Sequence, residues 1–167
     1  MERMKNISAT TKGVITGALM VAFSFGLYAW KKNFDNPLQY VVYGTYIGGI
    51  LWALFDLKKR GGGTFKNYFS EGFKCFIVVT LMMVLFTWTF ITMHPEFKEQ
   101  MAALMRTDLE KNKDLVASDI DTKVTAAKKM FLPVYLMMNA FIYLAIGALI
   151  AAIGGGFLSQ KQDAQYT

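Results

Sequence analysis

Long apolar runs alternate with charged segments along the chain. The runs cover about residues 13–30, 38–57, 73–93 and 130–157, and most charged residues fall between them. A helix crosses the hydrocarbon of a bilayer with about 20 residues, and its backbone polar groups must all be bonded within the protein. The pattern therefore predicts an all-α fold, an integral membrane four-helix bundle.

The composition agrees with this prediction. Of 167 residues, 54% are hydrophobic and 18% are charged, whereas soluble domains average roughly 45–50% and about 25%. These values exclude a disordered chain, a basic nucleic-acid-binding domain and a disulfide-stapled secreted domain, and the only cysteine is Cys75. We expect one membrane domain over residues 1–167, surrounded by membrane lipids and without a nucleic-acid partner.

Lysine and arginine in the loops predict the orientation, because they accumulate on the cytoplasmic side. The two sides tie at nine cations each, so the density of charge decides. Residues 58–74 hold five cations and one acid, whereas residues 94–129 interleave seven cations with seven acids. We therefore expect both termini and the loop between the second and third spans in the cytoplasm.

The loop before the third span carries a helical pattern. After Gly61-Gly62-Gly63 comes Thr64, a candidate N-cap, and rings then recur at positions 65, 68, 69 and 73. This spacing places the rings on one helical face. It predicts a short interfacial helix between spans 2 and 3, whose rings set its depth in the headgroup region or dock a partner.

A second helical pattern occupies the loop over residues 94–129. It breaks near Asn112–Asp114, and Ser118 with Asp121 then resembles a capping box. The pattern predicts an extracytoplasmic helical hairpin between spans 3 and 4. This hairpin either covers the outer end of the bundle or binds a partner.

Small residues at four-residue spacing indicate close packing between membrane helices. They recur in the first, second and fourth spans, for example at Gly13 and Gly17, whereas the third span is bulky and has no internal glycine. We therefore expect the third span to be peripheral. Its adaptable methionines, the aromatic segment and the hairpin then predict an interaction surface comprising Phe65, Phe69, Met82, Met83, Phe86 and Met101.

Candidate chemistry is sparse. Asp56, near the end of the second span, can pair with Lys59 or Arg60, and a partly solvated pair of this kind contributes about 0–1 kcal/mol; the alternative is a functional carboxylate. Asn139 is the clearest polar residue of the fourth span, and we expect it to bond a neighbouring helix.

His94 and Cys75 lie near opposite ends of the third span, so they cannot share a metal ion or form a nucleophile–base pair. The sequence predicts no catalytic residue, no metal site and no cofactor.

One stretch carries a family resemblance. Residues 64–74 read TFKNYFSEGFK and lead into a hydrophobic span; Pro95, a charged helical stretch and a last span follow. In order and length the whole chain resembles domain-of-unknown-function family 4199, small four-span bacterial inner-membrane proteins. The resemblance implies the four-span fold and an inner-membrane location, and it implies no activity and no catalytic residues.

Three functional hypotheses follow from these patterns. The leading one is a non-enzymatic integral membrane protein, a subunit or accessory factor of a larger inner-membrane complex with other membrane proteins as partners. The alternative is a small transporter or channel, as a monomer or homo-oligomer, which requires Asp56, Tyr46 and Asn139 to meet along one path. The third is a membrane-embedded enzyme.

Overall fold

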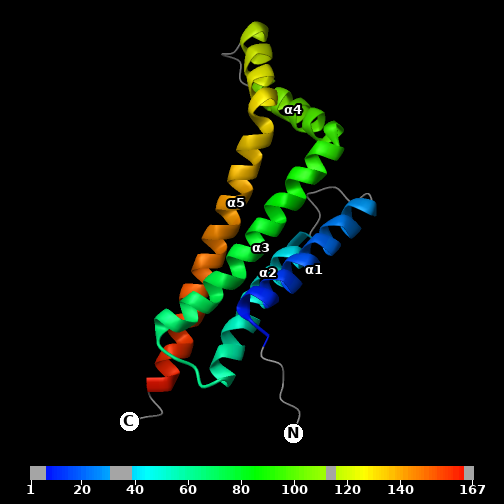
Figure 1. Ribbon diagram of the computed structural model, residues 1–167. Helices are drawn as coiled ribbons and strands as arrows, with labels where there is room; N and C mark the ends of the chain where they lie inside the picture. The colour runs from blue at the N-terminus through cyan, green and yellow to red at the C-terminus, as the bar shows by residue number, and fades with distance from the viewer. Residues whose placement is uncertain (1–6, 31–38, 112–115, 164–167) are drawn as a thin grey trace. The chain divides into compact units, whose positions relative to one another are not determined.

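The computed structural model describes residues 7–30, 39–111 and 116–163, and within these ranges the regular elements are all helices (Figure 1). The helices are α1 (Ala9–Ala29), α2 (Gln39–Lys59), α3 (Phe65–Met93), α4 (Pro95–Glu110) and α5 (Ala117–Asp163). Of these, α1, α2, α3 and α5 are long and apolar enough to cross a membrane. The predicted all-α, four-span fold is confirmed.

The first span begins earlier than its apolar run. The hydroxyl of Ser8 accepts a hydrogen bond from the backbone N–H of Thr11 at 3.1 Å and caps α1. A side-chain acceptor at this position satisfies one of the unpaired N–H groups of a helix start. Lys12 therefore lies inside the first turn of the span, and it does not merely precede the span.

The turn between α2 and α3 is built by glycine. The N–H of Gly61 donates to the carbonyl of Lys58 at 3.2 Å and that of Gly62 to Leu57 at 2.9 Å, which is the hydrogen-bond pattern of a Schellman helix end. Gly61 and Gly62 have φ values of 111° and 67°, a region that other residues enter only at a steric cost. Helix α2 therefore ends here, and α3 begins directly after Thr64.

The helix predicted between spans 2 and 3 is present, but it is continuous with the third span and not an element of its own. The aromatic segment forms the first turns of α3, a single helix of 29 residues from Phe65 onward. The backbone N–H groups of Asn67 and Tyr68 both donate to the carbonyl of Thr64. Helical bonding thus starts at Thr64, and the aromatic side chains belong to the span itself.

Two compact units divide the chain. Unit 1 comprises residues 1–83 and 140–167, and unit 2 comprises residues 84–139. In the described part of the chain, unit 1 contains α1, α2, the first part of α3 and the last part of α5. Unit 2 contains the rest of α3, α4 and the first part of α5.

The first part of α3 is the centre of unit 1. A Cβ added at Gly13 of α1 would lie 2.7 Å from the backbone oxygen of Cys75, and one added at Gly147 of α5 would lie 2.6 Å from Cγ of Phe76. One added at Gly72 of α3 would lie 2.7 Å from Cβ of Ala151. Both α1 and α5 thus approach α3 closely.

The expectation that the third span is peripheral is therefore wrong. The glycines of α1 and α5 do permit close approach, but the helix they approach is the bulky one, whose side chains fill the space that the glycines leave. Other small residues have no such neighbour, since a Cβ at Gly26, Gly44 or Gly48 would meet nothing within 4 Å. Spacing alone did not distinguish the two groups.

Unit 2 contains the predicted helical hairpin, in which α4 packs on the start of α5. Lys128 pairs with Glu99, and Arg106 Nη2 donates to Asp121 Oδ1 at 2.6 Å. Because later residues of α4 pair with earlier residues of α5, the two helices run antiparallel. Between them lies a small apolar cluster of Ala102, Leu109, Ile120 and Val124.

The hairpin differs from its prediction in two details. Helix α5 begins at Ala117, one residue before the predicted cap Ser118, and the carboxylate of Asp121 binds Arg106 on α4. The predicted break near Asn112–Asp114 lies outside the described residues.

Helix α5 is too long to lie wholly within the hydrocarbon. Its 47 residues give a contour of about 70 Å, against a hydrocarbon thickness of about 30 Å. Its first turns carry charged side chains, and most of these are exposed. The α4–α5 hairpin is therefore an extramembrane element.

We predict that Gly13→Ala destabilises the protein because the new methyl group would press against backbone, which cannot rotate away. The expected loss in free energy of unfolding is about 1–3 kcal/mol, measured by denaturant titration in detergent micelles. Gly26→Ala on the same helix is the matched control, since its methyl group meets nothing within 4 Å; it should be neutral or slightly stabilising through helix propensity. Equal effects of the two changes would contradict the packing of α1 on α3.

Candidate functional site

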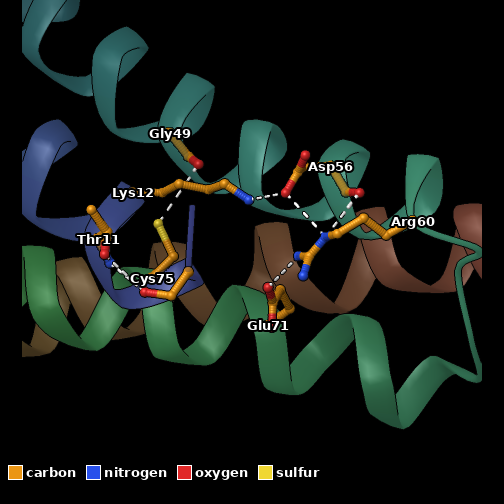
Figure 2. Close-up of polar contacts among 8 residues, drawn as sticks. Thr11, Lys12, Gly49, Asp56, Arg60, Glu71 and Cys75 are labelled. Carbon is orange, nitrogen blue, oxygen red and sulfur yellow. Dashed lines mark hydrogen bonds and ion pairs between the residues drawn. The ribbon is translucent and has the colours of Figure 1, made fainter. Parts of the chain in front are cut away.

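Four charged side chains, from α1, α2, the residue after α2 and α3, form a continuous series of ion pairs in unit 1, which we call the charge network (Figure 2). Lys12 Nζ donates to Asp56 Oδ2, and Arg60 Nε lies 3.2 Å from the same oxygen. Arg60 Nη2 donates to Glu71 Oε1 at 2.8 Å. The network links the start of α1, the end of α2 and the first turns of α3.

The helix ends place these side chains at one level. Lys12 lies in the first turn of α1, Asp56 in the last turn of α2, and Arg60 directly follows α2. Arg60 Nε also lies 3.4 Å from the carbonyl of Asp56, one of the last carbonyls of α2. A cation is favourable there because helix C-termini carry a partial negative charge. The short glycine turn then brings Arg60 against Glu71 on α3.

Lys12 is the most unusual member of the charge network because its side chain is 1% exposed, whereas that of Asp56 is 30% exposed. Its ammonium group also lies 5.8 Å from the ring centroid of Trp52, within the range of a cation–π contact. Removing one partner of a buried ion pair leaves an uncompensated charge and costs about 3–5 kcal/mol. Because Lys12 is buried, we expect the loss of Asp56 to cost more than the about 0–1 kcal/mol of a partly solvated pair.

The sequence had identified only part of this network. Pairing of Asp56 with Arg60 is confirmed, whereas the pair with Lys12 was missed because it bridges 44 positions. The sequence did contain one signal. Lys12 precedes the first apolar run, and the predicted topology places it on the same side of the membrane as Asp56. A lysine at such a border is usually a solvated flank, and this one is buried.

Close backbone contacts surround the charge network. Cys75 Sγ lies 3.6 Å from the carbonyl oxygen of Gly49, and both residues are buried (Figure 2). The buried side chain of Thr16 occupies the space where a Cβ of Gly49 would stand. Helices α1 and α2 thus touch at Gly49, and the thiol of Cys75 is shielded within the packing.

A second polar contact joins α2 to α5. The hydroxyl of Tyr46 donates to the carbonyl of Tyr143 at 2.7 Å, and the two rings meet edge to face with centroids 5.4 Å apart. Tyr46 is fully buried. Its hydroxyl is therefore engaged in holding two helices together.

Asn139 does not join these contacts. It lies in unit 2, and its Oδ1 is buried without a hydrogen-bond partner among the described residues. The expected interhelical bond through this oxygen is not formed. Within unit 1, Tyr46 and Asp56 lie on α2 and bind separate partners, Tyr143 and Lys12.

The predicted interaction surface is only partly exposed. Met83 is 4% exposed, and Met82 is half-buried against Gly17 of α1. Phe69, Phe86 and Met101 are also half-buried, whereas Phe65 is exposed. The exposed large residues in this part of α3 are Leu81, Leu85 and Trp88. The packing of α3 on α1 sets this rotation, which the sequence alone did not reveal.

An aromatic cluster in unit 2 was also missed. Phe97 of α4 lies with its ring centroid 6.1 Å from Phe131 and 5.9 Å from Tyr135 of α5. At the start of α4, His94 Nδ1 lies 2.8 Å from Glu96 Oε1. Hydrogen bonding to its own backbone N–H at the helix start, and then to His94, lowers the pKa of Glu96 below its usual value.

No group of three or more His, Cys, Asp or Glu side chains in the described ranges could hold a metal ion. The charge network, in which cations and carboxylates alternate, instead forms a structural junction of three helices.

A comparison with known protein families identifies the family of this chain. The model for the family described as Protein of unknown function (DUF4199) matches residues 11–160. The chain belongs to the DUF4199 family. The matched residues include all four members of the charge network and the α4–α5 hairpin of this DUF4199 protein. No curated protein and no solved structure matches it significantly.

We predict that Asp56→Asn lowers the free energy of unfolding by about 3–5 kcal/mol, because the Lys12 ammonium would stay buried without a carboxylate. Lys12→Met combined with Asp56→Asn should cost clearly less than the sum of the two single changes, which a double-mutant cycle in detergent measures.

The matched control is the exposed pair of Lys111 and Asp108, 2.7 Å apart with side chains 71% and 75% exposed. Its cycle should give a coupling of about 0–1 kcal/mol. Equal coupling in the two cycles would show that Lys12 is solvated.

Proposed function

We propose that this DUF4199 protein is a non-enzymatic membrane protein that works by contact, as a subunit or accessory factor of a larger inner-membrane complex. The main support for this proposal is the surface of the α4–α5 hairpin. Leu104 and Met105 are adjacent on α4 and 61% and 37% exposed. Exposed apolar side chains that lie together outside the membrane are candidates for contact with another protein.

These two residues lie on a helix that is not itself a candidate span. The 16 residues of α4 bury Phe97 and Ala102 against α5 and leave Leu104 and Met105 uncovered. Lipid can cover exposed apolar residues of the spans, whereas on the hairpin a protein partner would remove such residues from water. We propose that a second protein of the complex covers Leu104 and Met105.

Several contacts join the two helices of the hairpin. Ion pairs join α4 to α5 at Glu99 with Lys128 and at Arg106 with Asp121, and the cluster around Ala102 lies between them. A surface held in one conformation loses less entropy when it binds. Fixed helices thus favour recognition by a protein partner.

The ionisable groups of the charge network support the non-enzymatic part of the proposal. Lys12, Asp56, Arg60 and Glu71 are engaged with one another, and the hydroxyl of Tyr46 holds α5. Each of these contacts stabilises the packing of helices.

We further propose a bacterial inner membrane as the location, with both termini and the α2–α3 turn in the cytoplasm and the hairpin on the outer side. Support comes from the cations around the α2–α3 turn, because lysine and arginine near span ends favour the cytoplasmic face.

A single cysteine can test both proposals. In a Cys75→Ser background, Leu104→Cys should react from outside intact spheroplasts with a membrane-impermeant, thiol-specific photo-crosslinker, whereas Gly62→Cys should not react. Illumination should then join the Leu104→Cys protein to one discrete protein. Lys111→Cys, at an exposed position just after α4, is the control that should react without forming the same adduct.

The two readouts separate the two claims. Labelling at position 62 but not at 104 would reverse the orientation. Labelling at 104 without a discrete protein adduct, or with the same adduct from position 111, would contradict the contact role of the hairpin.

A further inference from the structure

The turn between α2 and α3 is flanked by four lysines. Lys58 and Lys59 end α2, and Lys66 and Lys74 lie in the first turns of α3. All four side chains are exposed, and none has a carboxylate within ion-pair distance in the described parts of the chain. We call these lysines, with the exposed rings of Phe65 and Phe73, the turn patch.

The nearby acids are already engaged. From residue 56 to residue 74 the chain has two acids, Asp56 and Glu71. Asp56 binds Lys12 and Arg60, and Glu71 binds Arg60. The charge network therefore balances its own two positive and two negative charges, and the four lysines of the turn patch keep a net charge of four.

The turn patch lies where two candidate spans end and begin, at Lys59 and Phe65. The exposed rings of Phe65 and Phe73 share the start of α3 with Lys66 and Lys74. Aromatic rings with neighbouring lysines are typical of the boundary between hydrocarbon and headgroups. At this depth the nearest anions are lipid phosphates.

We propose that the turn patch is a binding site for the headgroups of anionic phospholipids, with Lys58, Lys59, Lys66 and Lys74 as the phosphate-binding residues. The exposed rings of Phe65 and Phe73 insert among the adjoining acyl chains. An acidic protein segment would satisfy the charge, but it would leave the exposed parts of these rings, which Phe69 and Phe76 do not cover, in contact with water. The acyl chains of the same lipid molecules cover them.

The test uses the full-length protein in detergent with equimolar dioleoyl phosphatidylglycerol and dioleoyl phosphatidylcholine, and native mass spectrometry counts the bound lipids. Wild-type protein should prefer the anionic lipid. Each lysine near an anionic surface contributes a factor of about five, so changing all four lysines to Gln should reduce the preference to near parity. Changing them to Arg should preserve it.

The matched control changes Lys98, Lys111, Lys123 and Lys129 to Gln, which removes the same charge from unit 2. It should keep the preference of the wild type. If the fourfold variant of the turn patch does not fold, the pairs Lys58→Gln with Lys59→Gln and Lys66→Gln with Lys74→Gln should each lower the preference partially.

Three results would overturn the proposal. Wild-type protein without a preference would mean that the turn patch is not an anionic lipid site and that its lysines serve another partner. An equal loss of lipid preference in the turn-patch and control variants would mean that the preference depends on the net charge of the protein and not on the turn patch. An unchanged preference in the turn-patch variants would place the lipid elsewhere.

Discussion

A lysine ammonium group that is removed from water needs a carboxylate in contact with it, and the packing of unit 1 depends on this constraint. Lys12 is fully buried and Asp56 is its acidic partner. The pair can form only if the start of α1 and the end of α2 lie at the same level. Desolvation makes any other pairing of these two helices costly, so the pair selects one register as well as one neighbour.

The same interaction extends to α3 through Arg60 and Glu71. Helix-to-helix packing in lipid has little hydrophobic driving force, so polar contacts and close approach decide the arrangement. Unit 1 uses both: the charge network, and the close approach of glycines of α1 and α5 to α3. The bulky third span is therefore the helix around which the others pack.

Much of the fold was predictable because membrane crossing imposes a strong pattern. Apolar runs of about 20 residues indicated the four spans, and helical spacing indicated the hairpin. The rotation of α3 was not predictable: Leu81, Met82 and Met83 are similarly apolar, yet Leu81 is exposed and Met83 is buried. Their burial depends on how the neighbouring helices pack on α3, as Met82 does against Gly17 of α1.

The candidate site was less predictable for a related reason. Pairs at i+4, such as Asp56 with Arg60, follow from helix geometry, whereas Lys12 with Asp56 depends on which helices are neighbours. The exposed lysines of the α2–α3 turn also look like Lys12 in the sequence. What separates them is burial, which depends on tertiary packing and is invisible to local patterns.

Chemical accessibility of the lysines tests the central claim most directly. Folded protein in detergent is treated briefly with an amine-acetylating reagent, and mass spectrometry of its peptides compares the rate at Lys12 with the rates at Lys58 and Lys59. The buried ion pair predicts rapid modification of Lys58 and Lys59 and strong protection of Lys12, lost on unfolding. Modification of Lys12 as fast as Lys58 in folded protein would contradict the account.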